Sequence, residues 1–392
     1  MIFLFSRGDV IPRPLKQTMV EGKVKRSLST ALLAVASVVG LTMLPAGPSM
    51  AKAAAACGTF SVTNNWVSGF PVWAREAGYQ IVSGDFNGDG RGDLAMTGAQ
   101  SATTIPVAFS NGNGTFTVTN YYVPNFPIWA RTAGYQVVAG DFNGDGRSDL
   151  AMTGAQNATT IPVAFSNGNG TFGVTNYTVP NFPIWAREAG FQVVAGDFNG
   201  DGRSDLSMTG AQSATTIPVA FSNGNGTFGV TNSWVANFPI WAKTAGYQVV
   251  AGDFNNDGRS DLAMTGAQNA TTVPVAFSNG NGTFGVTNYT VPNFPIWARE
   301  AGFQVVAGDF NGDGRSDLSM TGAQSAVTIP VAFSNGNGTF GVTNSWVSGF
   351  PVWAREAGYQ VVAGDFDGDY RSDLAISGAQ SATTIPLAIS NC

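Results

Sequence analysis

Histidine is absent from the 392-residue chain, and cysteine occurs only twice. A zinc site would therefore lack its usual ligands, and two cysteines are too few for a disulfide-rich scaffold. Charged residues make up only 11% of the chain, and residues 57–392 contain no basic stretch of the kind that binds nucleic acid. Any metal must therefore be bound through oxygen atoms.

Glycine, by contrast, is abundant, with 50 copies, and aromatic residues account for 11% of the chain. This glycine content predicts many turns, and the supply of aromatic and β-branched residues is too large for a disordered protein. We therefore expect an ordered, turn-rich chain made of β-strands.

The N-terminal segment has the pattern of a targeting signal. Lys23, Lys25 and Arg26 precede an apolar stretch at 28–44, and Ser49-Met50-Ala51 forms a small-x-small cleavage site. We expect residues 1–56 to be a signal peptide and leader that are removed, which makes the mature protein secreted and extracellular.

Three further points concern this segment. Residues 1–18 are longer than a usual basic region, so Met19 is a candidate for the true start. Pro45, Pro48 and the small residues after them favour cleavage over a membrane anchor, and we expect no membrane span in the mature protein. Lipid attachment at Cys57 is a minor alternative, because the leucine expected three residues before the cysteine is missing.

Residues 57–392 consist of six nearly identical repeats of 56 residues. The same loop begins at a constant spacing, at Asp85, Asp141, Asp197, Asp253, Asp309 and Asp365. The 336 residues from Cys57 to Cys392 hold six whole repeats, so one closed or elongated repeat domain must account for all of them.

Each repeat contains four short strand patterns separated by turn signals. In the first repeat these patterns lie near 79–86, 94–98, 105–109 and 116–118, and glycine-rich or polar segments lie between them. Four strands per repeat predict an all-β fold, a six-bladed β-propeller of four-stranded blades.

The two cysteines lie at the two ends of the periodic region. In an uninterrupted repeat, Cys392 and Cys57 would be adjacent residues of one turn. We therefore expect the N-terminal strand to complete the last blade and a Cys57–Cys392 disulfide to lock this seam, as export permits.

The repeated loop, for example 85–93, has the pattern D-x-N-x-D-G-x-x-D. Side-chain oxygens at positions 1, 3, 5 and 9, with the carbonyl oxygen of position 7, can surround Ca²⁺, and the glycine at position 6 permits a sharp turn. Position 12 is Met96, so the loop is not an EF-hand. The predicted metal ligands are Asp85, Asn87, Asp89, Arg91, Asp93, Asp141, Asn143, Asp145, Arg147, Asp149, Asp197, Asn199, Asp201, Arg203, Asp205, Asp253, Asn255, Asp257, Arg259, Asp261, Asp309, Asn311, Asp313, Arg315, Asp317, Asp365, Asp367, Asp369, Arg371 and Asp373.

The distribution of charge supports a bound cation. From Cys57 onward, 19 of the 23 acidic residues lie in the six loops. Crowded carboxylates repel one another without a counter-ion, so we expect five or six Ca²⁺ per chain. The sixth loop differs from the others, because Tyr370 replaces glycine and Asp367 replaces asparagine, and its occupancy is left open.

The strand, calcium loop, strand and Asn-Gly-Asn-Gly-Thr-Phe turn resemble the FG-GAP or VCBS repeat of integrin α-chain propellers. Together with Asn-Phe-Pro-Ile-Trp-Ala-Arg, as at 125–131, the pattern is similar to the Psathyrella velutina type of lectin. The resemblance covers 57–392 and implies a calcium-bearing propeller with sugar pockets between blades. This chain has six repeats where that lectin type has seven, and it lacks the histidine of that segment.

The segment that links one blade to the next is the candidate ligand site. Its tryptophan can offer a flat face to a sugar ring, and its arginine or lysine can donate to hydroxyl groups. The alternative is that the tryptophan packs between blades and the arginine pairs with a loop carboxylate. The candidates are Trp73, Arg75, Trp129, Arg131, Trp185, Arg187, Trp241, Lys243, Trp297, Arg299, Trp353 and Arg355.

These observations favour a binding protein over an enzyme. No histidine is present to act as a base, and the linker glutamate of four repeats is replaced by Thr132 and Thr244 in the other two. Six equivalent sites suit multivalent capture of glycans or glycoconjugates. Our leading hypothesis is a calcium-dependent carbohydrate-binding protein. An adhesion or scaffold protein with a protein partner is the second hypothesis, and a polysaccharide-active enzyme is the third.

Overall fold

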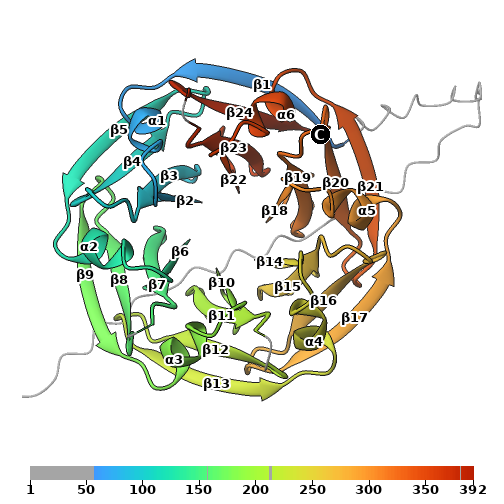
Figure 1. The fold of residues 1–392 in the computed structure, drawn as a ribbon, viewed down its shortest axis with the longest axis horizontal. Coiled ribbons are helices and arrows are strands. Elements are labelled where there is room, and N and C mark those ends of the chain that lie inside the picture. Colours follow the sequence, from blue (N-terminus) through green and yellow to red (C-terminus); the bar gives the residue numbers. More distant parts are fainter. Residues whose placement is uncertain (1–56, 157, 212–213, 380) are drawn as a thin grey trace, which may run out of the picture. The chain divides into compact units, whose positions relative to one another are not determined.

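The computed structural model describes residues 57–156, 158–211, 214–379 and 381–392. These residues form six four-stranded antiparallel sheets arranged as blades around a central axis (Figure 1). We number them blade 1 (β2–β5), blade 2 (β6–β9), blade 3 (β10–β13), blade 4 (β14–β17), blade 5 (β18–β21) and blade 6 (β22–β24 with β1). The expected six-bladed propeller is confirmed.

The first two strands of each blade lie nearest the axis. The innermost strands are β2 (Gln80–Gly84), β6 (Gln136–Gly140), β10 (Gln192–Gly196), β14 (Gln248–Gly252), β18 (Gln304–Gly308) and β22 (Gln360–Gly364). The second strands are fully buried and are β3 (Asp93–Thr97), β7 (Asp149–Thr153), β11 (Asp205–Thr209), β15 (Asp261–Thr265), β19 (Asp317–Thr321) and β23 (Asp373–Ser377).

The third and fourth strands form the outer half of each blade. The third strands are β4 (Thr104–Ser110), β8 (Thr160–Ser166), β12 (Thr216–Ser222), β16 (Thr272–Ser278), β20 (Thr328–Ser334) and β24 (Thr384–Asn391). The outermost strands are β1 (Thr59–Trp66), β5 (Phe116–Tyr122), β9 (Phe172–Thr178), β13 (Phe228–Trp234), β17 (Phe284–Thr290) and β21 (Phe340–Trp346).

The apolar core lies between neighbouring blades. Phe86, which follows β2, is fully buried and meets Phe172 of the next blade edge to face, with ring centroids 6.2 Å apart. The pair recurs around the ring, including Phe116 with Phe366 across the junction of blades 1 and 6. Such contacts bury the apolar faces that a single four-stranded sheet would leave in water.

A glutamine clasp joins the innermost strands of adjacent blades. The Gln80 side chain donates from Nε2 to the carbonyl oxygen of Tyr135 at 2.9 Å, and its Oε1 accepts from the backbone N–H of Val137 at 2.9 Å. Gln360 closes the circle with the same pair of bonds to Tyr79 and Ile81. The clasp satisfies backbone groups that face a neighbouring blade instead of a strand partner.

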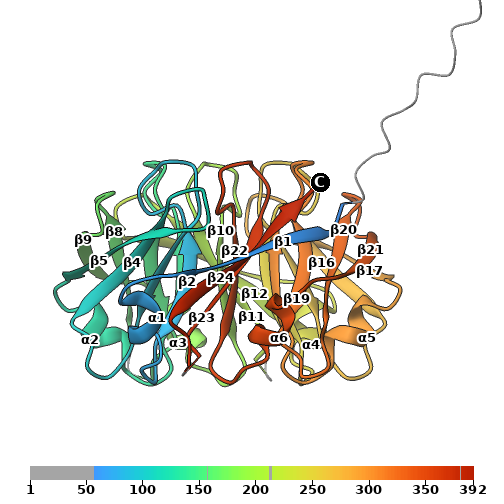
Figure 2. The same cartoon turned by 90° about the horizontal axis from the view of Figure 1, so that it is seen from above.

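The ring closes at a seam between the two ends of the periodic region. Strand β1 pairs with β24 from Thr59↔Asn391 to Trp66↔Thr384, so the first strand completes blade 6 as expected (Figure 2). A disulfide joins Cys57 to Cys392, whose Cα atoms are 4.5 Å apart. Because the Cys57 sulfur is in this bond, it is not free to carry a lipid.

A short helix lies in each linker between blades, where the sequence predicted no regular structure. The helices are α1 (Phe70–Trp73), α2 (Phe126–Ala130), α3 (Phe182–Ala186), α4 (Phe238–Ala242), α5 (Phe294–Ala298) and α6 (Phe350–Ala354). Each has proline in its first turn, where the missing N–H costs no hydrogen bond. The helices lie along one edge of the ring, and the C-terminus lies at the opposite edge (Figure 2).

The expected signal peptide, leader and alternative start at Met19 lie outside the described residues. Within the described part of the chain, no helix is long and apolar enough to cross a membrane.

Candidate functional site

The first aspartate of each loop organises the loop backbone. Asp85 Oδ1 accepts from the N–H of Gly88 at 2.7 Å and of Asp89 at 3.2 Å, and Oδ2 accepts from Gly90 at 2.8 Å. Gly90 has a φ of +84°, a backbone conformation that glycine adopts at little cost. The loop backbone therefore wraps around the carboxylate of its first aspartate.

The last aspartate of each loop is fully buried at the start of the second strand. Asp93 accepts from the N–H of Phe86 at 3.0 Å and from that of Ser110 at 2.8 Å. Burial raises the pKa of Asp93 to about 7, and the two backbone hydrogen bonds oppose the rise. Burial likewise raises the pKa of the Asp317 carboxyl to about 8. Among the residues that the structure describes, neither carboxylate forms a salt bridge with a basic side chain, which favours a bound cation.

The carboxylate at the fifth position of the loop contacts the arginine at the seventh. Asp89 forms a salt bridge with Arg91 and accepts from Asn87 Nδ2 at 2.9 Å. The sequence placed the side chains of positions 1, 3, 5 and 9 around one ion. Within the described residues, the carboxylate of position 5 contacts the arginine of position 7 in every loop, and its role as a metal ligand stays a prediction.

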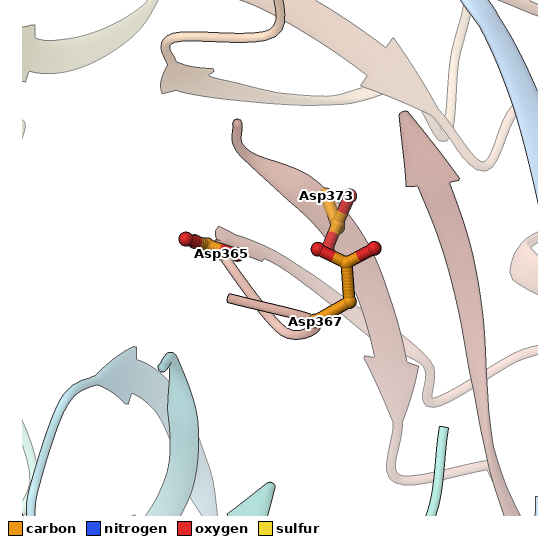
Figure 3. A group of neighbouring side chains, drawn as sticks. All are labelled: Asp365, Asp367 and Asp373. Atoms are coloured by element: carbon orange, nitrogen blue, oxygen red, sulfur yellow. The ribbon is translucent and has the colours of Figure 1, made fainter. Parts of the chain in front are cut away.

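The sixth loop brings three carboxylates together. Oxygens of Asp365, Asp367 and Asp373 all lie within 4.8 Å of one another (Figure 3). Two oxygens bound to one Ca²⁺ can be at most about 5 Å apart, since each Ca–O distance is about 2.3–2.6 Å. The donors present therefore fit a hard cation, and the other five loops offer asparagine at the position of Asp367.

Hydrogen bonds link the six loops into a closed circle. The N–H of Ser148 in the second loop donates to the carbonyl oxygen of Asp85 in the first at 2.6 Å, and Gly92 donates to Asp365 at 2.5 Å across the junction of blades 1 and 6. The Ser166 hydroxyl adds a bond of 2.7 Å to the carbonyl oxygen of Phe86. Each loop is therefore hydrogen-bonded directly to its neighbours.

Aromatic cavities lie beside the linker helices. Trp129 lines a cavity of about 440 Å³ with Thr132, Tyr135, Gln156 and Asn176. Equivalent cavities occur at Trp185, with about 190 Å³, and at Trp241, with about 280 Å³. Each tryptophan is half-buried, so part of its ring faces the solvent. The sequence singled out the tryptophans but missed the asparagine of the outermost strand.

Asparagine occupies the position of Asn176 in every repeat. The periodic pattern alone does not distinguish this asparagine from an ordinary surface residue. Its counterparts Asn232 and Asn288 line the cavities at Trp185 and Trp241. The shared position is the only sequence signal, because all six outermost strands have asparagine there. Amide side chains that converge on an aromatic cavity are suited to orient a polar ligand.

The linker arginines point toward the preceding blade and do not line these three cavities. Arg187 donates from NH1 to the carbonyl oxygen of Gln156 at 2.7 Å, and Arg355 donates to that of Gln324 at 2.7 Å. Their partners are backbone carbonyl oxygens, whereas the sequence alternative was a loop carboxylate.

The linker glutamate contacts the following blade. Glu76 accepts from the N–H of Ser101 at 3.0 Å and from its hydroxyl at 2.7 Å. The linker thus holds both blades that it joins, with the arginine on one side and the glutamate on the other. Thr132 and Thr244 replace the glutamate in the walls of the two larger cavities, whereas Glu188 lines the smallest of the three. The shorter threonine side chain leaves more space.

Comparison with known proteins agrees with this architecture. The FG-GAP-like repeat family matches residues 85–152, 141–208, 197–264 and 253–320. The chain belongs to the FG-GAP-like repeat family. Each matched unit runs from the calcium-type loop of one blade to the second strand of the next, so the repeat unit of the family is offset from the blade.

One known protein is similar to this chain in sequence, and another is similar in fold. Integrin alpha-V of Gallus gallus is 27% identical over 144 residues, which is 33% of this chain and only 13% of the integrin. A lectin from Agrocybe aegerita that recognises non-reducing terminal N-acetylglucosamine has a similar fold, with a TM-score of 0.54 and 22% identity over 80% of each chain.

Proposed function

We propose that this chain is an exported, calcium-bound propeller that binds carbohydrate at several equivalent sites. The observation that carries the proposal is the cavity repeated beside Trp129, Trp185 and Trp241, each with an asparagine of the outermost strand in its wall. A tryptophan face packs against the apolar face of a sugar ring, and the amide group hydrogen-bonds to its hydroxyls.

Calcium supports the opposite edge of the ring. In each loop, the side chains of positions 1, 3 and 9 would hold the ion, for example Asp365, Asp367 and Asp373 in the sixth loop. The ion would neutralise the buried aspartate that has no basic partner, and the hydrogen-bonded circle of loops would spread this stabilisation around the ring. The metal therefore has a structural role, at a distance from the aromatic cavities.

The basic and apolar pattern at 23–51 supports export, and so does the Cys57–Cys392 disulfide, since such bonds persist in oxidising compartments. A binding role without catalysis is favoured because the chain has no histidine and because serine hydroxyls donate to the linker glutamates Glu76, Glu300 and Glu356.

A glycan array with and without calcium tests the proposal. Terminal N-acetylglucosamine is the first probe, because the Agrocybe aegerita lectin of similar fold recognises it. We expect binding by the calcium-loaded protein and weaker binding after chelation. Trp129→Ala should lower the number of sites per chain by one, measured by calorimetry with a soluble sugar. An array without any signal from properly folded, calcium-loaded protein would contradict the proposal.

A further inference from the structure

The last residue of the outermost strand differs among repeats that are otherwise nearly identical. Three repeats have tryptophan at this position, and these side chains are 70–71% exposed. The other three have tyrosine or threonine. The tryptophans are Trp66, Trp234 and Trp346, and their counterparts are Tyr122, Thr178 and Thr290.

The neighbouring residues change together with this tryptophan. Two residues after it lies a small residue, Ser68, Ala236 or Ser348, whereas the other three repeats have proline. The residue before it is Asn65, Ser233 or Ser345, whereas the other repeats have tyrosine. The three positions change together in three separate repeats. The chain therefore contains two kinds of linker entry, three of each.

A second cavity lies beside the exposed tryptophan of blade 3. Trp234 lines a cavity of about 260 Å³ together with Trp241, Asn237, Phe284 and Asn288. Two of these residues, Trp241 and Asn288, also line the linker cavity of about 280 Å³. The two cavities are therefore neighbours that share one tryptophan and one asparagine as a common wall.

The sizes of the two cavities set the size of the occupant. Sites for drug-sized ligands commonly measure about 300–1,000 Å³, so each of these cavities suits a single ring. Two adjoining ring-sized cavities with a tryptophan in each wall suit two consecutive rings of one chain. The exposed Trp234 would then lose much of its contact with water, which removes the cost of leaving a large aromatic surface in solvent.

We propose that the cavity between Trp234 and Trp241 is a second sugar subsite, continuous with the first, so that this repeat binds an oligosaccharide of two or more rings. The two tryptophans and the outer-strand asparagine recur at Trp66 with Trp73 and at Trp346 with Trp353, where Gly69 and Gly349 replace Asn237, and the proposal extends to both repeats. This inference rests on the proposed carbohydrate function. The repeats with Thr178 and Thr290 bind one ring only.

The test compares N-acetylglucosamine with its β-1,4-linked trimer. In calorimetry, the wild-type protein should bind the trimer at three of its sites roughly two- to twelvefold more tightly than the single sugar, which is the factor that one aromatic contact contributes. The variant Trp66→Thr/Trp234→Thr/Trp346→Thr should lose this preference and keep its affinity for the single sugar. Threonine occupies the same position in two repeats of the chain, so the variant should fold.

The matched control is Tyr121→Ser/Tyr177→Ser/Tyr289→Ser, which removes exposed aromatic side chains from the other three repeats. This control should keep the preference for the trimer. In ¹⁹F NMR of protein labelled with 5-fluorotryptophan, the three signals that vanish in the tryptophan variant should shift with the trimer and not with the single sugar.

The outcomes separate the two proposals. Equal affinity of the wild-type protein for both sugars, or a trimer preference that survives the loss of all three tryptophans, would overturn the second subsite and leave the proposed function standing. Failure of both sugars to bind would overturn the inference, and a glycan array without any signal would overturn the carbohydrate function as well. A gain of trimer preference on installing Tyr177→Ser, Thr178→Trp and Pro180→Ala together would support it independently.

Discussion

The guanidinium group of Arg131 donates a hydrogen bond of 2.6 Å to the carbonyl oxygen of Gln100, in the blade that precedes it. The neighbouring Trp129 lines a cavity with Gln156, in the blade that follows. Two side chains that are close in sequence therefore face different blades. This separation predicts different effects for the two positions on stability and on binding.

Replacing Arg131 should affect stability more than binding. Arg131→Ala removes the bond to Gln100 and should lower the free energy of unfolding by about 1 kcal/mol, while the stoichiometry of glycan binding stays unchanged. Arg131→Lys is the matched control, because Lys243 occupies this position in another repeat. Urea unfolding and calorimetry measure the two effects. Loss of one glycan site in Arg131→Ala would show instead that the arginine contacts the ligand.

Calcium removal should lower thermal stability cooperatively. The N–H of Ser148 is bonded to Asp85 of the adjacent loop, so a loop that loses its ion loosens its neighbour as well. We expect a lower Tm in EDTA, restored by excess Ca²⁺, and five or six Ca²⁺ per chain by metal analysis. A Tm that EDTA leaves unchanged in protein shown beforehand to contain calcium would refute the metal assignment.

The chelated protein should become less stable as the pH rises. Burial raises the pKa of Asp93 to about 7, above the value of about 3.9 in the unfolded chain, so the folded state binds more protons between these pH values. The contribution to stability is complete below about pH 4 and is lost as the pH rises through about 7. With calcium bound, the slope should reverse, because protons compete with the ion. Melting curves from pH 4.5 to 8, with and without EDTA, distinguish the two slopes.

The fold could be predicted because the repeat period and the alternation of apolar residues specify strands and blade number directly. The helices α1–α6 were missed because four or five residues such as Phe126–Ala130 are too few for a helical period. Only the Phe-Pro start of the segment signals a helix, and the same residues also suit a loop.

The sequence predicts which kinds of ligand atoms the loops offer, but it does not predict every side-chain contact within them. The motif identifies the residues that carry oxygen donors. It does not determine whether the carboxylate of Asp89 binds an ion or pairs with Arg91, as it does in this structure. The cavity at Trp234 and Trp241 was missed for another reason. This cavity is lined by residues of two consecutive repeats, so the sequence of a single repeat does not reveal it.

Loss of the disulfide should loosen the seam before the rest of the ring. Cys57→Ser/Cys392→Ser frees the ends of β1 and β24, although their eight paired positions remain. In the chain-entropy model, so long a loop contributes about 6 kcal/mol, so we expect a clear fall in Tm. Hydrogen exchange should accelerate in β1 and β24 first, and strands such as β12 in blade 3 are the internal control. Uniform acceleration in all blades would contradict a local seam.

The sixth loop offers a test of backbone strain. Tyr370 has a φ of +67° and is 87% exposed, and its N–H donates to Asp365 Oδ2 at 2.8 Å, as Gly90 donates to Asp85 in the first loop. A left-handed conformation costs a non-glycine residue about 1–2 kcal/mol, and the greater freedom of glycine in the unfolded chain offsets about half of that cost. Tyr370→Gly should therefore raise the free energy of unfolding by roughly 0.5–1 kcal/mol in calcium-loaded protein, measured in urea. Gly90→Tyr is the reciprocal control and should lower it by a similar amount. If Tyr370→Gly destabilises the protein while Gly90→Tyr does so too, the tyrosine ring must make a compensating contact that outweighs the strain.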